Sequence, residues 1–298
     1  KLRGLAFNDA DVFFVNLTGG TKLMSIGVYN FFRNKQGSIF YMPIGKNLYR
    51  KIFPDVKKKE KPINYRVNIE EYLTSYGVEI IDKQSINPLL RSSGYTRRFF
   101  EYYIQAPSSD IDLLDSLRPY RSKNKVTIDK IDGLAVFLQR LNFDPYSPGR
   151  LTKAEIKYLT GEWFEEYVYS WLKSGLKLSE DAIVDSIQIK RKDAQNEFDV
   201  MFTYNNALYV IECKTSVFDK QDNRYIINET MYKLAALRMN FGLFAKAYLF
   251  TLSECGEDRG KIQQIHMDRS EVLNIKILDG RLLKYPIEQQ KIVNQIIG

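Results

Sequence analysis

Hydrophobic residues follow two different periods near the start of the chain. Residues 11–16 form a short apolar run suited to a buried strand, and residues 38–41 form another. Between them, residues 22–32 carry apolar side chains at helical spacing, namely Leu23, Ile26, Tyr29 and Phe31. A strand, a helix and a strand in this order predict one βαβ unit. We therefore expect a parallel sheet of Rossmann type in this part of the chain.

The remaining pattern predicts more α/β structure. Residues 63–148 are mixed, with helices expected near 69–76 and 128–141, and they end in the turn-forming stretch Asp144-Pro145-Tyr146-Ser147-Pro148-Gly149. Beyond that stretch we expect helices at 160–173, 228–240 and 259–274 and strands at 183–189, 245–251 and 275–278. A hairpin is expected at 196–214. These boundaries divide the chain into a first domain at 1–78, a linker or helical region at 79–149, and an α/β domain at 150–298.

The hairpin at 196–214 carries an unusual set of charges. If Asn205 and Asn206 form a two-residue turn, counting outward places Asp199 opposite Glu212. The same count places Glu197 opposite Lys214, whereas a three-residue loop would break this pairing. Because side chains alternate along a strand, all four charges share one face. The opposite face is then a core face, formed by Phe198, Val200, Phe202, Tyr209, Ile211 and Cys213.

Two carboxylates in directly opposite positions repel, because their Cβ atoms are only about 4.5–5.5 Å apart. A bound divalent cation removes this repulsion, whereas the alternative interpretation is a solvated polar face. Met201, Leu208 and Val210 make the other end of this face apolar, and charges that border a buried surface are costly unless they are paired or coordinated. We therefore interpret the charged end of the hairpin as a metal site.

The helix predicted before the hairpin supplies another acidic residue. Its apolar stripe is centred on Phe164, which places Glu165 at the edge of the buried face and Glu166 towards solvent. Glu165, Asp199 and Glu212 would together offer three oxygen donors. Oxygen donors suit Mg²⁺ or Mn²⁺, and the chain has a single histidine, so a zinc site is not expected.

Composition narrows the class of protein. The 298 residues carry a net charge of +8 and have a pI near 9.2, which favours a polyanionic partner such as nucleic acid. No apolar run approaches the roughly 20 residues of a membrane span, so no membrane contact is expected. Two cysteines cannot form a disulfide framework, and we infer a reducing cytoplasm. Because the chain opens at Lys1 and enters almost directly into a strand, we expect that its natural N-terminal part is missing.

A glycine-rich turn lies between the first strand and the first helix. Thr18-Gly19-Gly20-Thr21-Lys22 places backbone N–H groups and the positive end of a helix where they favour a phosphate. It is neither a P-loop nor a Gly-x-Gly-x-x-Gly motif, and such turns are often only tight connections. Its position at the carboxyl edge of a parallel sheet supports a ligand site. The next strand brings Gly45 and Lys46 to the same edge.

The charged hairpin and its preceding helix resemble a known group of enzymes. Asp199 followed by Glu212-x-Lys214, after a helix with Gly161-x-x-Phe164-Glu165, resembles the PD-(D/E)xK nuclease superfamily, although no proline precedes Asp199. The resemblance implies that Asp199 and Glu212 bind Mn²⁺ or Mg²⁺ and that Glu165 is an accessory acidic ligand or a water organiser. It also implies that Lys214 positions or activates the attacking water and helps to neutralise the phosphorane-like charge. Glu197 and Lys233 would be accessory residues, the first orienting Lys214 and the second contacting phosphate.

The glycine-rich turn resembles a second family. Residues 15–25, Val-Asn-Leu-Thr-Gly-Gly-Thr-Lys-Leu-Met-Ser, resemble the signature of CARF domains, which sense cyclic oligoadenylates in type III CRISPR immunity. Together the two halves resemble CARF–PD-(D/E)xK effectors, with residues 76–148 least matched. The resemblance implies a homodimer that binds cyclic tetra-adenylate and cleaves nucleic acid in the prokaryotic cytoplasm. The implied ligand contacts are Asn16, Thr18, Gly19, Gly20, Thr21, Lys22, Gly45 and Lys46.

The predicted fold is therefore α/β, with a partial Rossmann-like CARF domain followed by a restriction-endonuclease-like domain. The first CARF strand and its loop are not recognisable in the sequence. Three other functions remain open: a constitutive restriction- or repair-type nuclease, a non-catalytic nucleotide-responsive regulator, and a HEPN ribonuclease. The last rests on Arg259-x₆-His266 and would need an all-helical domain.

Overall fold

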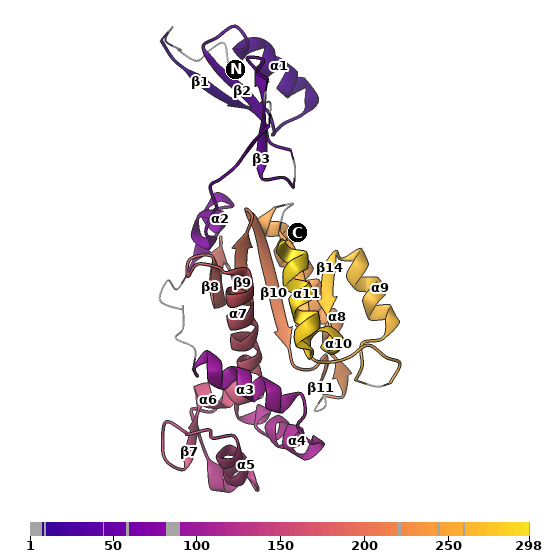
Figure 1. Cartoon of the computed structure of the whole chain (residues 1–298). Helices are drawn as coiled ribbons and strands as arrows, with labels where there is room; N and C mark the ends of the chain where they lie inside the picture. Colours follow the sequence, from indigo (N-terminus) through magenta and orange to yellow (C-terminus); the bar gives the residue numbers. More distant parts are fainter. Residues whose placement is uncertain are drawn as a thin grey trace. The chain divides into compact units, whose positions relative to one another are not determined.

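The computed structural model divides the chain into two units, Lys1–Arg66 and Val67–Gly298 (Figure 1). The structure describes residues 8–297 except 9, 44, 58–59, 82–89, 220–221, 243–244 and 259. Each unit has its own β-sheet. The predicted α/β class is confirmed for both.

The first unit is a four-stranded sheet in the order β1-β2-β3-β4. Its elements are β1 (Phe13–Asn16), α1 (Lys22–Phe32), β2 (Gly37–Tyr41), β3 (Leu48–Phe53) and β4 (Glu60–Pro62). β1 and β2 are parallel and are joined through α1, so the predicted βαβ unit is confirmed. β3 and β4, which the hydrophobic pattern did not predict, add to the sheet in antiparallel fashion.

One glycine allows β2 to lie beside β1. Gly37 pairs with Phe13 and has a φ of +148°, a conformation that side chains with a Cβ rarely adopt. A Cβ at this position would lie 2.0 Å from the carbonyl oxygen of Phe13. Any other residue would therefore push the two parallel strands apart at the point where β2 begins.

The second unit is built on a six-stranded sheet in the order β14-β13-β10-β9-β8-β5. β10, β13 and β14 are parallel to one another, whereas β9, β8 and β5 extend the sheet with antiparallel pairings. Its strands are β5 (Glu79–Ile80), β8 (Ile183–Arg191), β9 (Ala194–Tyr204), β10 (Ala207–Lys214), β13 (Lys246–Thr251) and β14 (Ile275–Leu278). Two small ribbons pair β6 (Lys125–Thr127) with β7 (Arg150–Thr152) and β11 (Phe218–Asp219) with β12 (Arg224–Tyr225).

Helices cover both faces of this sheet. One core contains side chains from α3 (Ser93–Tyr103), α4 (Ser108–Ser116), α5 (Leu134–Arg140), α6 (Lys153–Lys157), α7 (Trp163–Leu176), α10 (Gly280–Leu283) and α11 (Pro286–Ile297). The other contains side chains from α2 (Ile69–Ser75) and α8 (Ile227–Arg238), with α9 (Gln264–Val272) packed against it. Short turns of 3₁₀-helix occur at η2 (Arg118–Tyr120), η3 (Ile128–Lys130) and η5 (Met239–Phe241), and η4 (Tyr158–Glu162) is a π-helical turn.

The boundary between the units differs from the predicted one. The division lies after Arg66 rather than after residue 78, because Ile69, Tyr72 and Leu73 of α2 are buried in a core of the second unit. In its described part, the region 79–149 follows the helical alternative of the prediction rather than the linker alternative. Phe100 of α3 stacks on Tyr167 of α7, with ring centroids 3.9 Å apart and planes inclined by 5°. The helices of this region are therefore built into the second unit.

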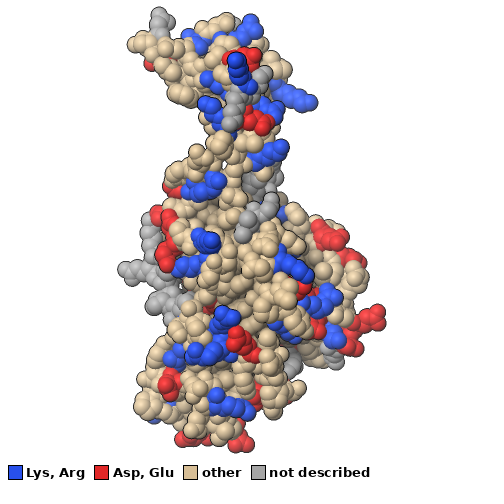
Figure 2. Space-filling model, in the orientation of Figure 1, with Lys and Arg blue, Asp and Glu red and all other residues tan. Residues whose placement is uncertain are grey.

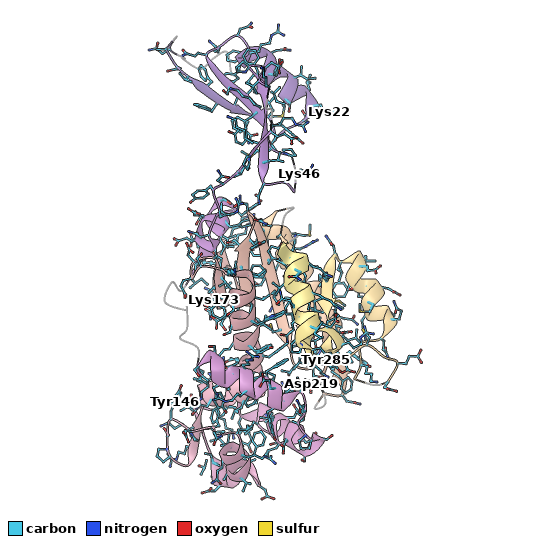
Figure 3. All side chains as sticks on the ribbon, viewed as in Figure 1. Lys22, Lys46, Tyr146, Lys173, Asp219 and Tyr285 are labelled. Carbon is cyan, nitrogen blue, oxygen red and sulfur yellow. The ribbon has the colours of Figure 1, made fainter. Side chains whose placement is uncertain are left out.

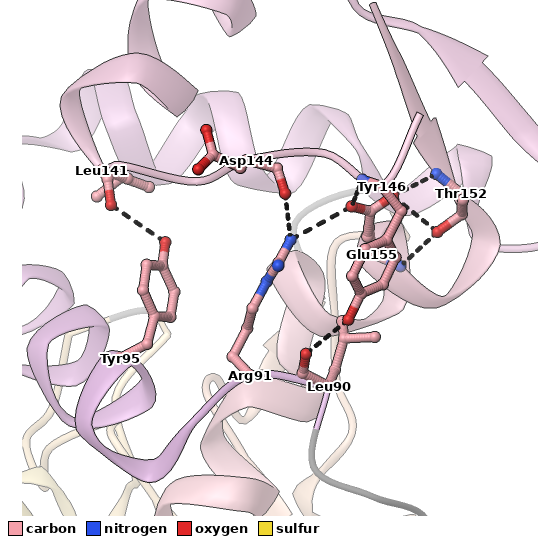
Figure 4. Close-up of polar contacts among 8 residues, drawn as sticks. All are labelled: Leu90, Arg91, Tyr95, Leu141, Asp144, Tyr146, Thr152 and Glu155. Atoms are coloured by element: carbon pink, nitrogen blue, oxygen red, sulfur yellow. Dashed lines mark hydrogen bonds and ion pairs between the residues drawn. The ribbon is translucent and has the colours of Figure 1, made fainter. Parts of the chain in front are cut away.

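Arg91 fastens the start of this helical segment to α6 (Figure 4). Its Nη2 donates to the carbonyl oxygen of Asp144 at 2.7 Å and lies 3.3 Å from Oε1 of Glu155, which is fully buried. Its guanidinium also lies over the ring of Phe143, 4.1 Å from the centroid. The backbone N–H of Tyr146 donates to the same Glu155 oxygen. The Pro-rich stretch that was predicted to separate two domains is thus held inside one unit.

Charged side chains are scattered over the visible face of both units, with Lys and Arg interspersed with Asp and Glu (Figure 2). The excess positive charge is therefore not gathered in one broad patch on that face. In the part of the chain that is described, no helix is long and apolar enough to cross a membrane.

Candidate active site

The hairpin β9–β10 has the predicted turn. Tyr204 pairs with Ala207, and the pairing continues outward to Val200 and Ile211. Asn205 and Asn206 have φ angles of 50° and 60°, as a two-residue turn of type I′ requires. The predicted loop and its register are confirmed over this stretch.

The predicted pairs Asp199–Glu212 and Glu197–Lys214 lie beyond the end of the observed ladder, which closes with Val200 and Ile211. The ladder between the two strands stops, and the Asp199 carboxylate accepts a hydrogen bond from the backbone N–H of Cys213 at 2.7 Å. On its other side β9 pairs with β8, where Glu197 lies opposite Gln188. The carboxylate of Asp199 thus takes the place of a ladder bond and enters the gap between the strands.

The face assignment of Phe198 is also wrong. Phe198 packs in the core around α2 and α8, whereas Val200, two residues later, lies in the opposite core. Opposite this point Ser186 has a φ of 47°, and the pairing between β8 and β9 skips Ser186 and Asp199. At this irregularity the regular alternation of side chains between the two faces of the sheet is interrupted. Counting alternate residues along the sequence could not reveal it.

Three oxygen atoms converge on the ammonium group of Lys214. Its Nζ lies 2.8 Å from Glu212 Oε1, 3.3 Å from Asp199 Oδ2 and 3.1 Å from the carbonyl oxygen of Cys213. The side chains of Glu212 and Asp199 are 7% and 15% exposed, and that of Lys214 is 29% exposed. A second ammonium, Lys233 of α8, lies 3.9 Å from the same Glu212 oxygen. The structure therefore brings Asp199, Glu212, Lys214 and Lys233 together.

Burial and mutual repulsion shift the acid–base properties of this cluster. Burial raises the pKa of Asp199 to about 6, Lys214 opposes the rise, and the charge of Glu212 adds to it. Burial alone would lower the pKa of Lys214, but the charges of Asp199 and Glu212 outweigh it and raise that pKa above its usual value. The lysine therefore stays protonated at neutral pH.

Glu165 and Glu166 on α7 have different surroundings. Glu165 lines the same cleft as Asp199, and its pKa is raised well above the usual value by burial and then by the charge of Asp199. Glu166 was predicted to face solvent, but it is 7% exposed. Its carboxylate accepts hydrogen bonds from the N–H of Leu90 at 2.7 Å and from the hydroxyl of Thr96 at 3.2 Å. The surface prediction was wrong because α3 covers this side of α7.

A cleft of about 770 Å³ opens over the cluster. It is lined by Glu165, Asp199 and Lys214, by Glu197 and Lys233, and by the segment after β10 that includes Asp219 (Figure 3). Its remaining wall includes residues that sequence reasoning missed, among them Arg118, Arg121, Lys157 and Glu162. These residues come from elements in or beside the segment least matched to a known family, so no motif marked them.

The donor set fits a divalent cation. Among the described residues no group of three or more His, Cys, Asp or Glu side chains is arranged as a metal site. Two carboxylates and the Cys213 carbonyl nevertheless point at one position, which the Lys214 ammonium holds. Oxygen atoms of this kind are the ligands that Mg²⁺ and Mn²⁺ prefer. If the Lys214 side chain moved away, the oxygens of Asp199, Glu212 and Cys213 would be free to bind a cation.

The glycine-rich turn of the first unit is held by its own side chains. The hydroxyl of Thr18 lies 2.6 Å from Asn16 Oδ1 and accepts the N–H of Met42 at 2.7 Å. Thr21 caps α1, its hydroxyl accepting the N–H of Met24. Gly20 has a φ of +94°, which explains a glycine there. Asn16 and Thr18 therefore tie the ends of β1 and β2 together and shape the turn.

The other residues predicted at this edge lie at the surface. Lys22 is exposed at the first position of α1, and Lys46 is exposed in the turn before β3 (Figure 3). Gly19 has open space where a Cβ would be, and so does Gly45, which has a φ of +76°. A ligand could therefore approach the backbone closely at both glycines.

His266 is a buried side chain of α9. It is 4% exposed within α9, and its Nδ1 accepts the N–H of Gln263. Burial and the neighbouring charge of Arg269 lower its pKa. The unit around it is mixed α/β, which removes the all-helical setting that a HEPN ribonuclease needs. Its predicted partner Arg259 lies outside the described residues.

Comparisons with known families match two separate parts of the chain. Residues 1–72 match the family described as the Card1 CARF domain. Residues 152–277 match the family described as the Card1-like endonuclease domain. No curated protein matches the chain.

Solved structures share the fold. Protein VC1899 from Vibrio cholerae is 22% identical with a TM-score of 0.70, over 95% of this chain and 75% of that one. Can2 from Sulfobacillus thermosulfidooxidans, solved in complex with cyclic tetra-adenylate, is 23% identical with a TM-score of 0.66, over 94% and 74% of the two chains. These similarities establish the arrangement of elements across most of the chain.

Proposed function

We propose that this chain, which joins a Card1-type CARF domain to a Card1-like endonuclease domain, is a metal-dependent nuclease activated by cyclic tetra-adenylate in type III CRISPR defence. The observation that carries the proposal is the convergence of Asp199, Glu212 and the Cys213 carbonyl on one position, which the Lys214 ammonium holds. The solved relative Can2 binds cyclic tetra-adenylate, which supports the choice of activator. Such a nuclease would act in the prokaryotic cytoplasm.

The residues of the cleft divide the chemistry among them. Asp199, Glu212 and the Cys213 carbonyl would hold Mn²⁺ or Mg²⁺, with Glu165 as a further acidic ligand or water acceptor. The ion would lower the pKa of a bound water and offset charge on the phosphate. Lys214 stays protonated, so it can hydrogen-bond the attacking water and stabilise negative charge on the phosphodiester as the bond breaks. Lys233 adds a second positive charge on the Glu212 side.

The first unit would bind the activator at the carboxyl edge of β1 and β2. The contacts proposed are the turn residues Asn16, Thr18, Gly19, Gly20, Thr21 and Lys22, together with Gly45 and Lys46. The N–H groups at the start of α1 and the Lys22 charge favour a phosphate there. Asn16 and Thr18 would act by holding the turn in shape, because their side chains bond to each other and to Met42.

The proposed assembly is a homodimer. On α1 no residue is buried, and Leu23, Met24 and Ile26 are 79%, 60% and 58% exposed. An apolar helix face of this kind favours association with another surface, and a second copy of the chain would supply one. The oligomeric state is measured directly by light scattering with and without cyclic tetra-adenylate.

A cleavage panel tests the proposed activity. Labelled single- and double-stranded DNA and RNA are incubated with the full chain, Mn²⁺ and each cyclic oligoadenylate, and the Asp199→Ala variant is the control. We expect cutting only with cyclic tetra-adenylate and only with an intact Asp199. Equal rates without the activator would favour a constitutive nuclease. If the unaltered chain cuts nothing under any condition, the regulator without catalysis becomes the better explanation.

A further inference from the structure

We propose that the helical segment before the nuclease core is part of the substrate site, and that Arg118, Arg121 and Lys157 bind phosphates of the nucleic acid beside the one that is cut. The inference rests on the proposed nuclease function. Arg118 and Arg121 lie between the two family matches, whereas Lys157 lies near the start of the endonuclease match at residues 152–277.

The side of the cleft that carries Arg118 and Arg121 packs against the rest of the second unit. Phe99 and Phe100 of α3 and Leu117, beside η2, lie in the same core as Trp163 and Phe164 of α7. Each of these side chains is at most 3% exposed. Residues carried by α3, α4 and η2 therefore keep a constant position relative to Glu165, which lies on the same helix α7.

Arg118 reaches directly to the end of the catalytic strand. Its Nη2 lies 3.3 Å from the hydroxyl of Thr215, the residue after Lys214, and its Nε bonds Asp115 at 2.9 Å. A guanidinium has five N–H donors, and Nη1 has no partner among the described residues. Its side chain is 33% exposed into the cleft. A planar guanidinium in this position can donate two hydrogen bonds to a phosphate next to Lys214.

Arg121 and Lys157 share a single carboxylate. Lys157 Nζ lies 3.0 Å and Arg121 Nη2 3.9 Å from the same oxygen of Glu162, and each basic side chain is 40% exposed. Two positive charges against one negative charge leave a surplus on this wall of the cleft. Structural ion pairs normally balance, so the surplus favours an anion that is not part of the chain.

The chemistry of the cleft requires such a wall. The carboxylates of Glu165, Asp199 and Glu212 would repel a polyanion that approached on their side. Nucleic-acid binding is dominated by contacts between phosphates and Lys or Arg, each of which releases bound counterions. Arg118, Arg121 and Lys157 lie along the cleft that also contains the catalytic cluster. A strand held by these residues would pass over Lys214.

Salt-dependent binding tests the inference. In the full chain with Asp199→Asn, cyclic tetra-adenylate and Mn²⁺, binding of a fluorescein-labelled oligonucleotide is measured at several salt concentrations. Arg121→Gln with Lys157→Gln should weaken binding at least about tenfold and reduce the slope of log K against log salt by about 0.7–0.9 per lost contact. Arg118→Gln should weaken binding, and Arg118→Lys should recover only part of it, because an ammonium lacks the planar fork.

The control is Arg97→Gln with Lys291→Gln, which removes the same charge from ion pairs outside the cleft. It should leave binding and the salt slope close to those of the parent. If the parent binds the oligonucleotide and the cleft variants match it in affinity and slope, the inference is wrong while the proposed nuclease stands. If the parent neither binds nor, with Asp199 restored, cuts any substrate, both proposals fall. Thermal unfolding of each variant shows whether a loss of binding reflects a loss of fold.

Discussion

The Lys214 ammonium lies 2.8 Å from Glu212 Oε1, at the position to which the oxygens of the cluster point. A divalent cation must displace this group in order to bind there. We expect Lys214→Met to bind Mn²⁺ more tightly, by roughly tenfold or about 1.4 kcal/mol, while losing phosphodiester cleavage. Calorimetric titration of Mn²⁺ into the full chain measures the first effect and a cleavage assay the second.

Lys233→Met is the matched control for that comparison. Its ammonium is 3.9 Å from the same oxygen and 50% exposed, so its removal should change Mn²⁺ affinity much less. Unchanged or weaker Mn²⁺ binding by Lys214→Met would show that the lysine does not compete for the cation position.

Asp199 should be needed for metal binding and cleavage but not for activator binding. Asp199→Asn keeps an oxygen that can accept the Cys213 N–H, so the strand ends should stay together. Because the charge is lost, we expect cleavage to fall by at least about a hundredfold, as when other charge-stabilising groups are removed. Binding of cyclic tetra-adenylate, measured by calorimetry, should match the unaltered chain. A variant that loses both activities would indicate a wider structural role.

Glu166 should hold the helical segment against α7. Glu166→Ala leaves the half-buried Leu90 N–H without its carboxylate, which should lower the free energy of unfolding by about 1–3 kcal/mol. Glu166→Gln retains an oxygen acceptor and should lose less. Denaturant unfolding at pH 7 compares the two variants. Equal losses would mean that the hydrogen bond to Leu90 contributes little.

Asp185 should make stability depend on pH. It is 4% exposed, and burial raises its pKa to about 6 from a usual value near 3.8. The folded state therefore binds the proton more tightly than the unfolded state, so stability falls as pH rises from about 4 to 6 and is level above that. Asp185→Asn removes this cost. Relative to the unaltered chain, it should gain stability across that window, by up to about 3 kcal/mol at neutral pH.

Thermal unfolding of the two proteins from pH 4 to pH 8 measures this difference. Subtracting the two curves removes the contributions of other buried groups, such as His266, whose lowered pKa acts in the opposite direction. A difference that does not change between pH 4 and pH 6 would contradict the assignment.

The turn in the first unit should respond differently to two substitutions. Thr18→Ala removes the hydroxyl that joins Asn16 to Met42, whereas Thr18→Ser keeps it. We expect Thr18→Ala to raise the concentration of cyclic tetra-adenylate needed for half-maximal cleavage by about tenfold and Thr18→Ser to raise it little. Lys22→Ala should also weaken activation, through lost charge. Cleavage rates at saturating activator should stay close to those of the unaltered chain.

Much of the hairpin could be predicted because its turn is encoded locally. Asn205 and Asn206 specify a two-residue turn, and the register from Tyr204–Ala207 to Val200–Ile211 follows from it. The side of the sheet that Phe198 faces could not be predicted, since the irregularity beside it involves Ser186 of another strand. The turn sequence determines the pairing of residues near the turn, whereas an irregularity in the neighbouring strand β8 affects residues farther away.

Tertiary packing explains the other differences. A helical wheel shows where one apolar stripe lies, but α7 is covered on a second side by α3, and so Glu166 is buried. The helix α11 was not predicted although it begins at Pro286 and carries Ile292, Val293 and Ile296 at helical spacing. That signal was present in the sequence, whereas the contacts of Arg118 with Thr215 depend on the fold of a segment without a motif.

The turn of the catalytic hairpin also bonds to the start of its own unit. Asn206 Oδ1 accepts the backbone N–H of Val67 at 2.9 Å, and Val67 directly follows Arg66, the last residue of the first unit. From this bond, β10 runs about 20 Å to Glu212 at its far end. Tension on the chain at residue 66 would therefore pass through this hydrogen bond into the β9–β10 hairpin, which carries Asp199 and Glu212.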